Sequence, residues 1–145
     1  LCDASQEEDP LGPDANDPSL STDYLTHALA SRRIPIKVAL LDQAVVAGIG
    51  NIYASEALWR ARINPRTPAQ RLSRRRLGRL VKAIQATMRD ALNRQRRYYG
   101  SEGIAPEARF AVYDREGGPC RRCGKRIRRI PQAARSTYYC GNCQR

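Results

Sequence analysis

The clearest alternation of hydrophobic and polar positions lies in the second half of the chain. After Ser73, apolar residues recur at intervals of three and four, at Leu77, Leu80, Val81, Ile84, Met88, Ala91 and Leu92. This spacing places them on one face of an α-helix. Much of the remaining surface is basic, with Arg74, Arg75, Arg79, Lys82 and Arg89. The pattern predicts one long amphipathic helix whose apolar stripe covers a core.

Two shorter helices are predicted upstream of it. Residues 21–32 form the first, and Ser21 or Thr22 can cap its start with a hydroxyl oxygen. Pro35 can open the second, over residues 36–41, because its fixed φ suits a first helical turn.

A further helix is predicted where the apolar run AVVA ends in the sequence GIGN. Asn51 is positioned to cap a helix over residues 52–62, and the Pro-rich segment 64–68 breaks the chain after it. A dinucleotide fingerprint would need glycine where Tyr53 stands, so that motif is excluded.

The same GIGN segment also has the features of an anion cradle. Gly50 lets backbone N–H groups approach a ligand closely, a helix N-terminus follows, and Asn51 adds a side-chain amide. Lys37 lies near the start of the preceding helix and could add a charge. The residues alone leave both interpretations open, helix capping and phosphate binding.

The C-terminal segment carries four cysteines in two C-x-x-C pairs separated by sixteen residues: Cys120, Cys123, Cys140 and Cys143. Two residues between thiolates allow a tight backbone turn to present both sulfurs to one ion, and two such turns complete a tetrahedron. The spacing predicts one structural Zn²⁺. Because all four ligands are thiolates, no position is left for a reacting water, so the metal is expected to fold the segment and do no chemistry.

Two other uses of paired cysteines fit the sequence less well. A disulfide framework is favoured by an oxidising compartment, which no apolar leader segment indicates here. A redox C-x-x-C usually opens a helix in a βαβ unit, which neither pair does. Cys2 has no partner and is interpreted as incidental.

The rest of the C-terminal segment favours β-structure. The runs IRRI and STYYC predict a zinc-clasped hairpin, and residues 110–113 predict a short strand leading into it. Residues 98–107 are interpreted as a loop.

Charge divides the chain unevenly. The net charge is +12, yet residues 1–23 hold seven acids and no lysine or arginine, so the remainder carries 26 basic residues against seven acids. Such a basic domain indicates a polyanionic partner, nucleic acid first and a membrane surface a weak second. No apolar run approaches the roughly twenty residues of a membrane span. We expect an acidic linker or disordered end over 1–20, a helical domain over 21–108 and a zinc finger over 109–145.

Three segments point to a known family. Residues 37–56 read KVALLDQAVVAGIGNIYASE, residues 112–120 read VYDREGGPC and residues 134–144 read ARSTYYCGNCQ. Together they resemble the C-terminal half of formamidopyrimidine-DNA glycosylases, over about Leu11 to Arg145. The resemblance implies a mainly α fold: a helix-two-turns-helix bundle followed by a small β-hairpin zinc finger.

The resemblance also implies roles for particular residues. Lys37 and Asn51 match residues of the family that grip DNA phosphates, and Arg135 matches the zinc-finger arginine that reaches the DNA backbone beside the lesion. Gly50 belongs to the same candidate cradle. Glu56 matches a family glutamate near the pocket of the flipped base.

The family's catalytic groups are not matched in this chain. They are an N-terminal proline, whose amine forms a Schiff base with the sugar C1′, and the glutamate that follows it. The resemblance therefore implies a DNA-formamidopyrimidine glycosylase with abasic-site lyase activity on oxidised purines, while this chain alone is predicted to bind damaged double-stranded DNA without catalysis. We expect a monomer in the bacterial cytoplasm, associated with the nucleoid. The alternative is a non-catalytic zinc-ribbon protein that binds nucleic acid.

Overall fold

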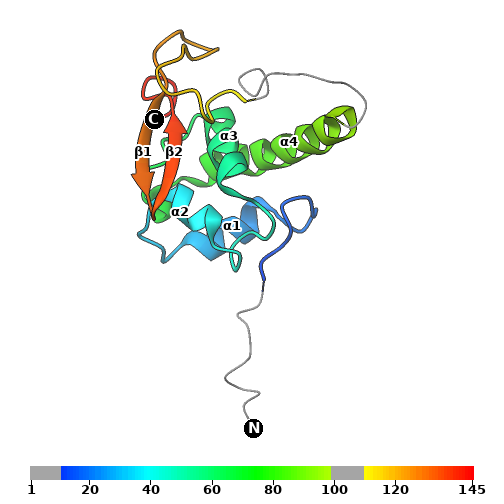
Figure 1. Ribbon diagram of the computed structural model, residues 1–145. Helices are drawn as coiled ribbons and strands as arrows, with labels where there is room; N and C mark the ends of the chain where they lie inside the picture. The colour runs from blue at the N-terminus through cyan, green and yellow to red at the C-terminus, as the bar shows by residue number, and fades with distance from the viewer. Residues whose placement is uncertain (1–10, 99–109) are drawn as a thin grey trace.

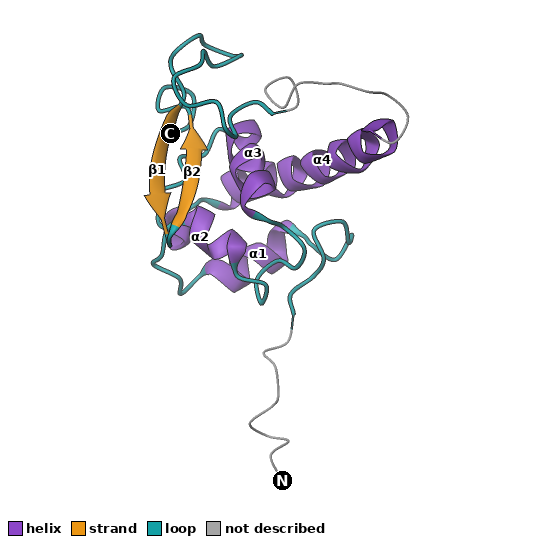
Figure 2. Ribbon diagram, in the orientation of Figure 1, coloured by secondary structure: helices purple, strands orange, loops and turns teal. Residues whose placement is uncertain are grey.

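A computed structural model describes residues 11–98 and 110–145 (Figure 1). Helices dominate the first part and a two-stranded antiparallel sheet the second (Figure 2). The elements are α1 (Thr22–Leu29), α2 (Ile36–Leu41), α3 (Asn51–Ala61), a 3₁₀ turn (Ala69–Arg71), α4 (Arg74–Tyr98), β1 (Arg128–Gln132) and β2 (Arg135–Tyr139). The predicted mainly α class, with a helical bundle followed by a hairpin, is confirmed.

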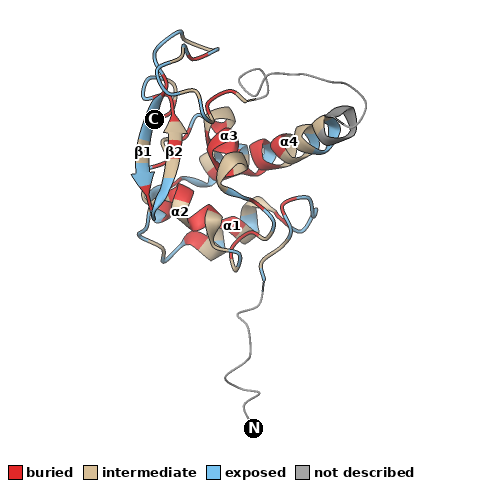
Figure 3. Ribbon diagram, in the orientation of Figure 1, coloured by how far each residue is buried: buried red, intermediate tan, exposed pale blue. Residues whose placement is uncertain are grey.

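The main core lies where the four helices meet (Figure 3). The first half of the α4 stripe is buried there, with Leu80 and Ile84 fully shielded from solvent, while Leu92 is 46% exposed. The apolar periodicity thus correctly predicts the helix, but its last turns extend beyond the core that the stripe covers. Within the described residues, no helix combines the length and the apolarity needed to cross a bilayer.

One helix start follows the predicted capping, that of α1 at Ser21; α4 has a serine cap that was not predicted, and α3 departs from the prediction. Ser21 Oγ accepts the backbone N–H of Tyr24 at 3.1 Å, and Ser73 Oγ accepts that of Arg76 at 3.2 Å. The predicted Asn51 cap is wrong: Gly50 occupies the N-cap position, and the Asn51 side chain is directed elsewhere.

The predicted linker over residues 1–20 is wrong for the part that the structure describes. Ala15 and Leu20 are buried in the main core, and Gly12 and Ala15 donate backbone hydrogen bonds of 2.9 Å to the carbonyls of Gln43 and Ala47. Two apolar side chains and these backbone pairings hold the segment in spite of its acidic, Pro-rich composition. Residues 1–10 lie outside the description.

The hairpin carries a two-residue turn between Gln132 and Arg135. Both turn residues, Ala133 and Ala134, have positive φ, at 49° and 63°. This combination is that of a type I′ turn, whose twist matches the strands it joins. Alanine accepts positive φ only at a cost of about 1–2 kcal/mol, because its Cβ approaches the following carbonyl. The turn that carries Arg135 is therefore strained.

The segment leading into the finger is not the strand predicted over residues 110–113. Phe110 begins a series of bends and turns, and the next three backbone N–H groups are engaged by a side chain described below. Of the loop predicted over residues 98–107, Tyr98 instead ends α4, and the rest lies outside the described residues.

Candidate nucleic-acid interface and metal site

The four cysteine sulfurs converge at the end of the hairpin away from its turn. Their ligand atoms all lie within 4.8 Å of one another. The Cys120–Cys143 sulfur separation is 3.9 Å and that of Cys123–Cys140 is 3.5 Å. A tetrahedral zinc site with bonds of about 2.3 Å requires sulfurs about 3.8 Å apart. The donor set and its spacing therefore fit one structural Zn²⁺, as predicted.

Local hydrogen bonds favour the thiolate form of one ligand, Cys123, whereas burial raises the pKa of Cys140 and Cys143. The pKa of the Cys123 thiol is lowered to about 6, first by the hydrogen bond from the Lys125 backbone N–H and then by that from the Asn142 side chain. Donors directed at a sulfur stabilise its negative form, which is the form that a metal binds.

Helix α3 supplies a second layer around the cysteines. The indole Nε1–H of Trp59 donates to the Cys120 sulfur at 3.3 Å. The Arg122 guanidinium lies 4.0 Å from the centre of the Trp59 ring and donates to the Trp59 carbonyl at 3.0 Å. Hydrogen bonds of this kind orient metal ligands. The finger is thus joined to the helical domain through one of its own zinc ligands.

The Glu56 carboxylate makes a second junction between the two parts. It is 5% exposed and accepts three consecutive backbone N–H groups, those of Ala111 at 2.7 Å, Val112 at 2.9 Å and Tyr113 at 3.0 Å. We call this arrangement the Glu56 clasp. A carboxylate that accepts several N–H bonds fixes the backbone that supplies them. Glu56 therefore sets where the chain enters the finger.

Two glutamines attach the finger to the loop after α3. Gln144 accepts the Cys140 backbone N–H at 2.7 Å and donates to the Ile63 carbonyl at 2.9 Å, and it is buried. Gln132 donates to the Pro65 carbonyl at 3.2 Å. The hairpin is thereby held along its length against the helices.

Lys37 lies at the centre of the candidate phosphate site. Its residue is fully buried, and its ammonium group donates to Asn51 Oδ1. Burial, and secondly the charge of Arg135, lower the pKa of Lys37 to about 8. A buried ammonium with one neutral partner is incompletely compensated, and an approaching anion would restore the missing interaction.

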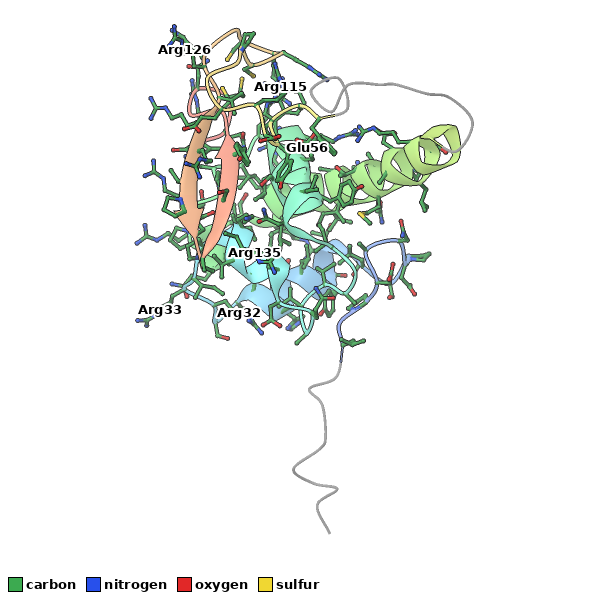
Figure 4. The ribbon with its side chains drawn as sticks, in the orientation of Figure 1. Arg32, Arg33, Glu56, Arg115, Arg126 and Arg135 are labelled. Atoms are coloured by element: carbon green, nitrogen blue, oxygen red, sulfur yellow. The ribbon has the colours of Figure 1, made fainter. Side chains whose placement is uncertain are left out.

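Asn51 connects the helical domain to the hairpin. Its Nδ2 donates to the Ser136 carbonyl at 3.0 Å, while its Oδ1 accepts from Lys37. This bridge explains why the side chain does not cap its own helix. Arg135, the residue before Ser136, is exposed next to the hairpin turn, and its label overlaps α2 in the view of Figure 4. The structure thus brings together Lys37, Asn51 and Arg135, which are distant in sequence.

Gly50 leaves space beside this cluster. A Cβ placed on it would meet nothing within 4 Å, and the residue is exposed. The first N–H groups of a helix have no acceptors within the helix. Among the described residues no side chain caps α3, so these groups of α3 also lack a side-chain acceptor. An anion can therefore approach the positive end of α3 closely.

Some of these residues could not be found from the sequence. Trp59 and Gln132 lie in no motif, and Gln144 lies in one of the segments that carry the family resemblance but was given no role. Each acts through a partner more than sixty residues away. Glu56 was singled out only through the family resemblance, which placed it near the flipped base. In the structure, its carboxylate organises the entry to the finger; its place beside a flipped base stays a prediction.

The comparisons with known proteins agree with this geometry. The family model described as the formamidopyrimidine-DNA glycosylase H2TH domain matches residues 11–101. The model of a zinc finger found in FPG and IleRS matches residues 117–145. The chain is 47% identical over 142 residues to the formamidopyrimidine-DNA glycosylase of Bordetella petrii, covering 93% of this chain and 52% of that protein. That of Chloroflexus aurantiacus is 48% identical over 136 residues, covering 86% and 49%.

Solved structures give the same result. The MutM (Fpg) protein from Thermus thermophilus superposes with a TM-score of 0.80 at 34% identity, over 92% of this chain and 53% of that one. The Lactococcus lactis FPG (MutM) complex with FAPY-dG containing DNA gives 0.83 at 32% identity, over 93% and 51%. The chain spans about half the length of the curated relatives it matches. It belongs to the formamidopyrimidine-DNA glycosylase family, of which it presents the helix-two-turns-helix and zinc-finger portion.

Proposed function

We propose that this chain is the DNA-gripping portion of a base-excision-repair glycosylase and abasic-site lyase that acts on oxidised purines. The convergence of Lys37, Asn51 and Arg135 beside the uncapped start of α3 carries the proposal. The named structures of Lactococcus lactis relatives hold DNA with an abasic site or FAPY-dG. The partner proposed here is likewise damaged double-stranded DNA, bound by a monomer in the bacterial cytoplasm.

The geometry suits phosphates rather than bases. Lys37 and the N–H groups of α3 would take one phosphate at Gly50, and Arg135 would take a neighbouring one from the hairpin turn. Backbone contacts of this kind fix the register and orientation of a duplex without reading its sequence. They also stabilise a bent duplex, which offsets the few kcal/mol lost when a base leaves the stack.

Zinc contributes indirectly to the proposed contacts with DNA phosphates. When bound, the ion supplies fold stability rather than reactivity, because four thiolates would fill its coordination sphere. Cys140 directly follows β2, the strand that begins at Arg135 and Ser136. Holding that end of the strand helps to keep Arg135 near Lys37, with which it can act.

Fluorescence anisotropy measures the affinity of the chain for a DNA duplex at increasing salt concentrations and so tests the proposed phosphate contacts. Arg135→Gln is preferred to a substitution of the buried Lys37, since Arg135 is exposed. Its loss should weaken binding alike for undamaged duplex and for duplex with an abasic-site analogue. It should also reduce the slope of log K against log salt by about 0.9 for the lost contact.

Arg126→Gln is the matched control, an exposed arginine at the other end of the hairpin. An Arg135→Gln variant with the salt slope of Arg126→Gln would contradict the assigned contact.

We further propose that the chain alone does not cleave DNA. A Schiff base with the sugar needs a free amine of suitable pKa near C1′. Of the three lysines, Lys37 is committed to Asn51, while Lys82 and Lys125 are exposed on α4 and in a cysteine turn. Borohydride treatment with an abasic duplex should therefore trap no specific adduct, although the chain retards the same duplex in a gel. A trapped adduct at stoichiometric yield would contradict this part of the proposal.

A further inference from the structure

A second concentration of arginine lies at the zinc end of the finger, away from Arg135. A pocket of about 530 Å³ is lined there by the turns of the cysteine cluster and by five arginines, Arg62, Arg76, Arg79, Arg122 and Arg145. No Asp or Glu of the described residues lines it. Arg135 begins β2, and the cysteine cluster lies at the other end of this five-residue strand, which spans about 13 Å at about 3.3 Å per residue. The pocket is thus a separate feature from the grip proposed above.

Backbone structure brings these arginines together. Arg62 ends α3 in the left-handed conformation, with φ of 60°, and its carbonyl accepts the Arg145 backbone N–H at 3.2 Å. Arg76, in the first turn of α4, donates to the Arg145 carbonyl. The end of α3, the start of α4 and the last turn of the finger therefore form one wall.

No Asp or Glu of the described residues forms an ion pair with the arginines of the pocket. The ion pairs found among them involve Arg32, Arg60, Arg74 and Arg129, none of which lines the pocket. Arg122 Nη1 is buried without a hydrogen-bond partner in the same part of the chain. Burial, and secondly the charge of Arg79, lower the pKa of Arg76. These guanidinium groups repel one another, and the acceptors that Arg76 and Arg122 have among the described residues are main-chain oxygens.

The nearby metal site accounts for only part of this charge. Four thiolates around Zn²⁺ carry a formal net charge of about −2, whereas the pocket is lined by five guanidinium groups. A substantial positive excess remains after the thiolates are counted.

We infer that this pocket binds a phosphate group as a second anion site of the protein. Planar guanidinium groups present paired N–H donors that match phosphate oxygens, and several can share one dianion. A volume of about 530 Å³ falls within the range of ligand sites, roughly 300–1,000 Å³. The phosphate comes either from a free phosphate compound or from a nucleic-acid backbone. The inference does not depend on the DNA grip at Lys37.

The test is a titration of the zinc-loaded full chain with inorganic phosphate, followed through the side-chain ¹⁵Nε–Hε resonances of the arginines. A parallel titration with chloride at matched ionic strength removes the general effect of salt. Resonances of Arg76 and Arg79 should shift saturably with phosphate, and Arg79→Gln should weaken this binding about tenfold. Zinc content measured after each titration confirms that the finger is intact.

Arg75→Gln is the control. It removes an exposed arginine of the same α4 turn that does not line the pocket. This variant should bind phosphate like the unchanged chain. Identical shifts with phosphate and chloride, or unweakened binding by Arg79→Gln, would overturn the inference.

Duplex binding then separates the two sources of phosphate. If the pocket takes a nucleic-acid backbone, Arg79→Gln reduces the salt slope of duplex binding by about 0.9. If it takes a free phosphate compound, Arg79→Gln binds duplex like Arg75→Gln and loses only the phosphate shifts. Because the Arg76 and Arg79 resonances report on this pocket, which Lys37 does not line, failure of the phosphate contacts at Lys37 would be distinguishable from failure of this site.

Discussion

The ammonium group of Lys37 is buried against the Asn51 side-chain carbonyl, which is its hydrogen-bond partner. Burial, followed by the charge of Arg135, brings its pKa from about 10.5 down to about 8. Between these two values the unfolded chain binds more protons than the folded one. Folding stability should therefore rise with pH across this window and show no dependence on Lys37 below it.

DNA affinity should change in the opposite direction. A phosphate at Gly50 requires the charged form of Lys37, so duplex binding should weaken as pH rises through about 8. Anisotropy titrations from about pH 7 to about pH 9.5 at constant ionic strength bracket this pKa and measure the dependence. Lys37→Met should bind more weakly at neutral pH and lose the transition. A wild-type affinity that is flat across this range, or an unchanged transition in Lys37→Met, would refute the role.

The Glu56 clasp predicts a large effect for an isosteric change. Glu56→Gln replaces one carboxylate oxygen with an NH₂ group, which must face a backbone N–H donor among residues 111–113. Loss of charge-assisted bonds, together with a buried unsatisfied donor, should lower the free energy of unfolding by about 2–4 kcal/mol. Urea denaturation measures the change.

Asp90→Asn is the control for this substitution. Asp90 is 46% exposed and forms a surface ion pair with Arg60, and such pairs contribute about 0–1 kcal/mol. Equal destabilisation by the two substitutions would show that the clasp has no special energetic weight.

The strained turn predicts stabilisation by glycine. Ala133→Gly and Ala134→Gly should each raise the free energy of unfolding by about 0.5–1 kcal/mol, because relief of the positive-φ strain exceeds the entropy that glycine adds to the unfolded chain. Differential scanning calorimetry detects the gain. Ala86→Gly, in the middle of α4, should have the opposite sign, at a cost of about 1 kcal/mol. Destabilisation at both turn positions would indicate that the turn is not strained.

Zinc removal can be followed through the single tryptophan. Trp59 donates to the Cys120 sulfur, so chelation should change its fluorescence in step with zinc release. Cys140→Ser should lose stoichiometric zinc and the finger's order, while the helical signal in far-UV circular dichroism is largely kept. Cys2→Ser should retain zinc, since Cys2 is not one of the four ligands. Full zinc content in Cys140→Ser would refute the ligand set.

Local patterns in the sequence were sufficient for much of this fold. The stripe from Leu77 to Met88 predicts α4, and the two C-x-x-C pairs predict the metal site, because each signal repeats within a few residues. Ser21 predicts a helix start for the same reason.

Features that depend on distant partners could not be predicted in this way. Residues 110–113 are suited to a strand, but the Glu56 carboxylate takes three of their N–H groups, and a ladder cannot form. Asn51 is suited to a cap, yet Lys37 and Ser136 occupy its amide. The arginine pocket likewise exists only after three separated segments meet.

The cysteine cluster and the Glu56 clasp join residues at different separations along the chain. Cys123 and Cys140 are 17 positions apart and Cys120 and Cys143 are 23 apart, whereas Glu56 contacts residues 55 to 57 positions away. Contacts between near residues close smaller loops and form sooner. We therefore expect an order of assembly in which the metal-bound hairpin forms first and is later captured by α3. Newly made chain would then recruit zinc before its phosphate-binding surface is complete.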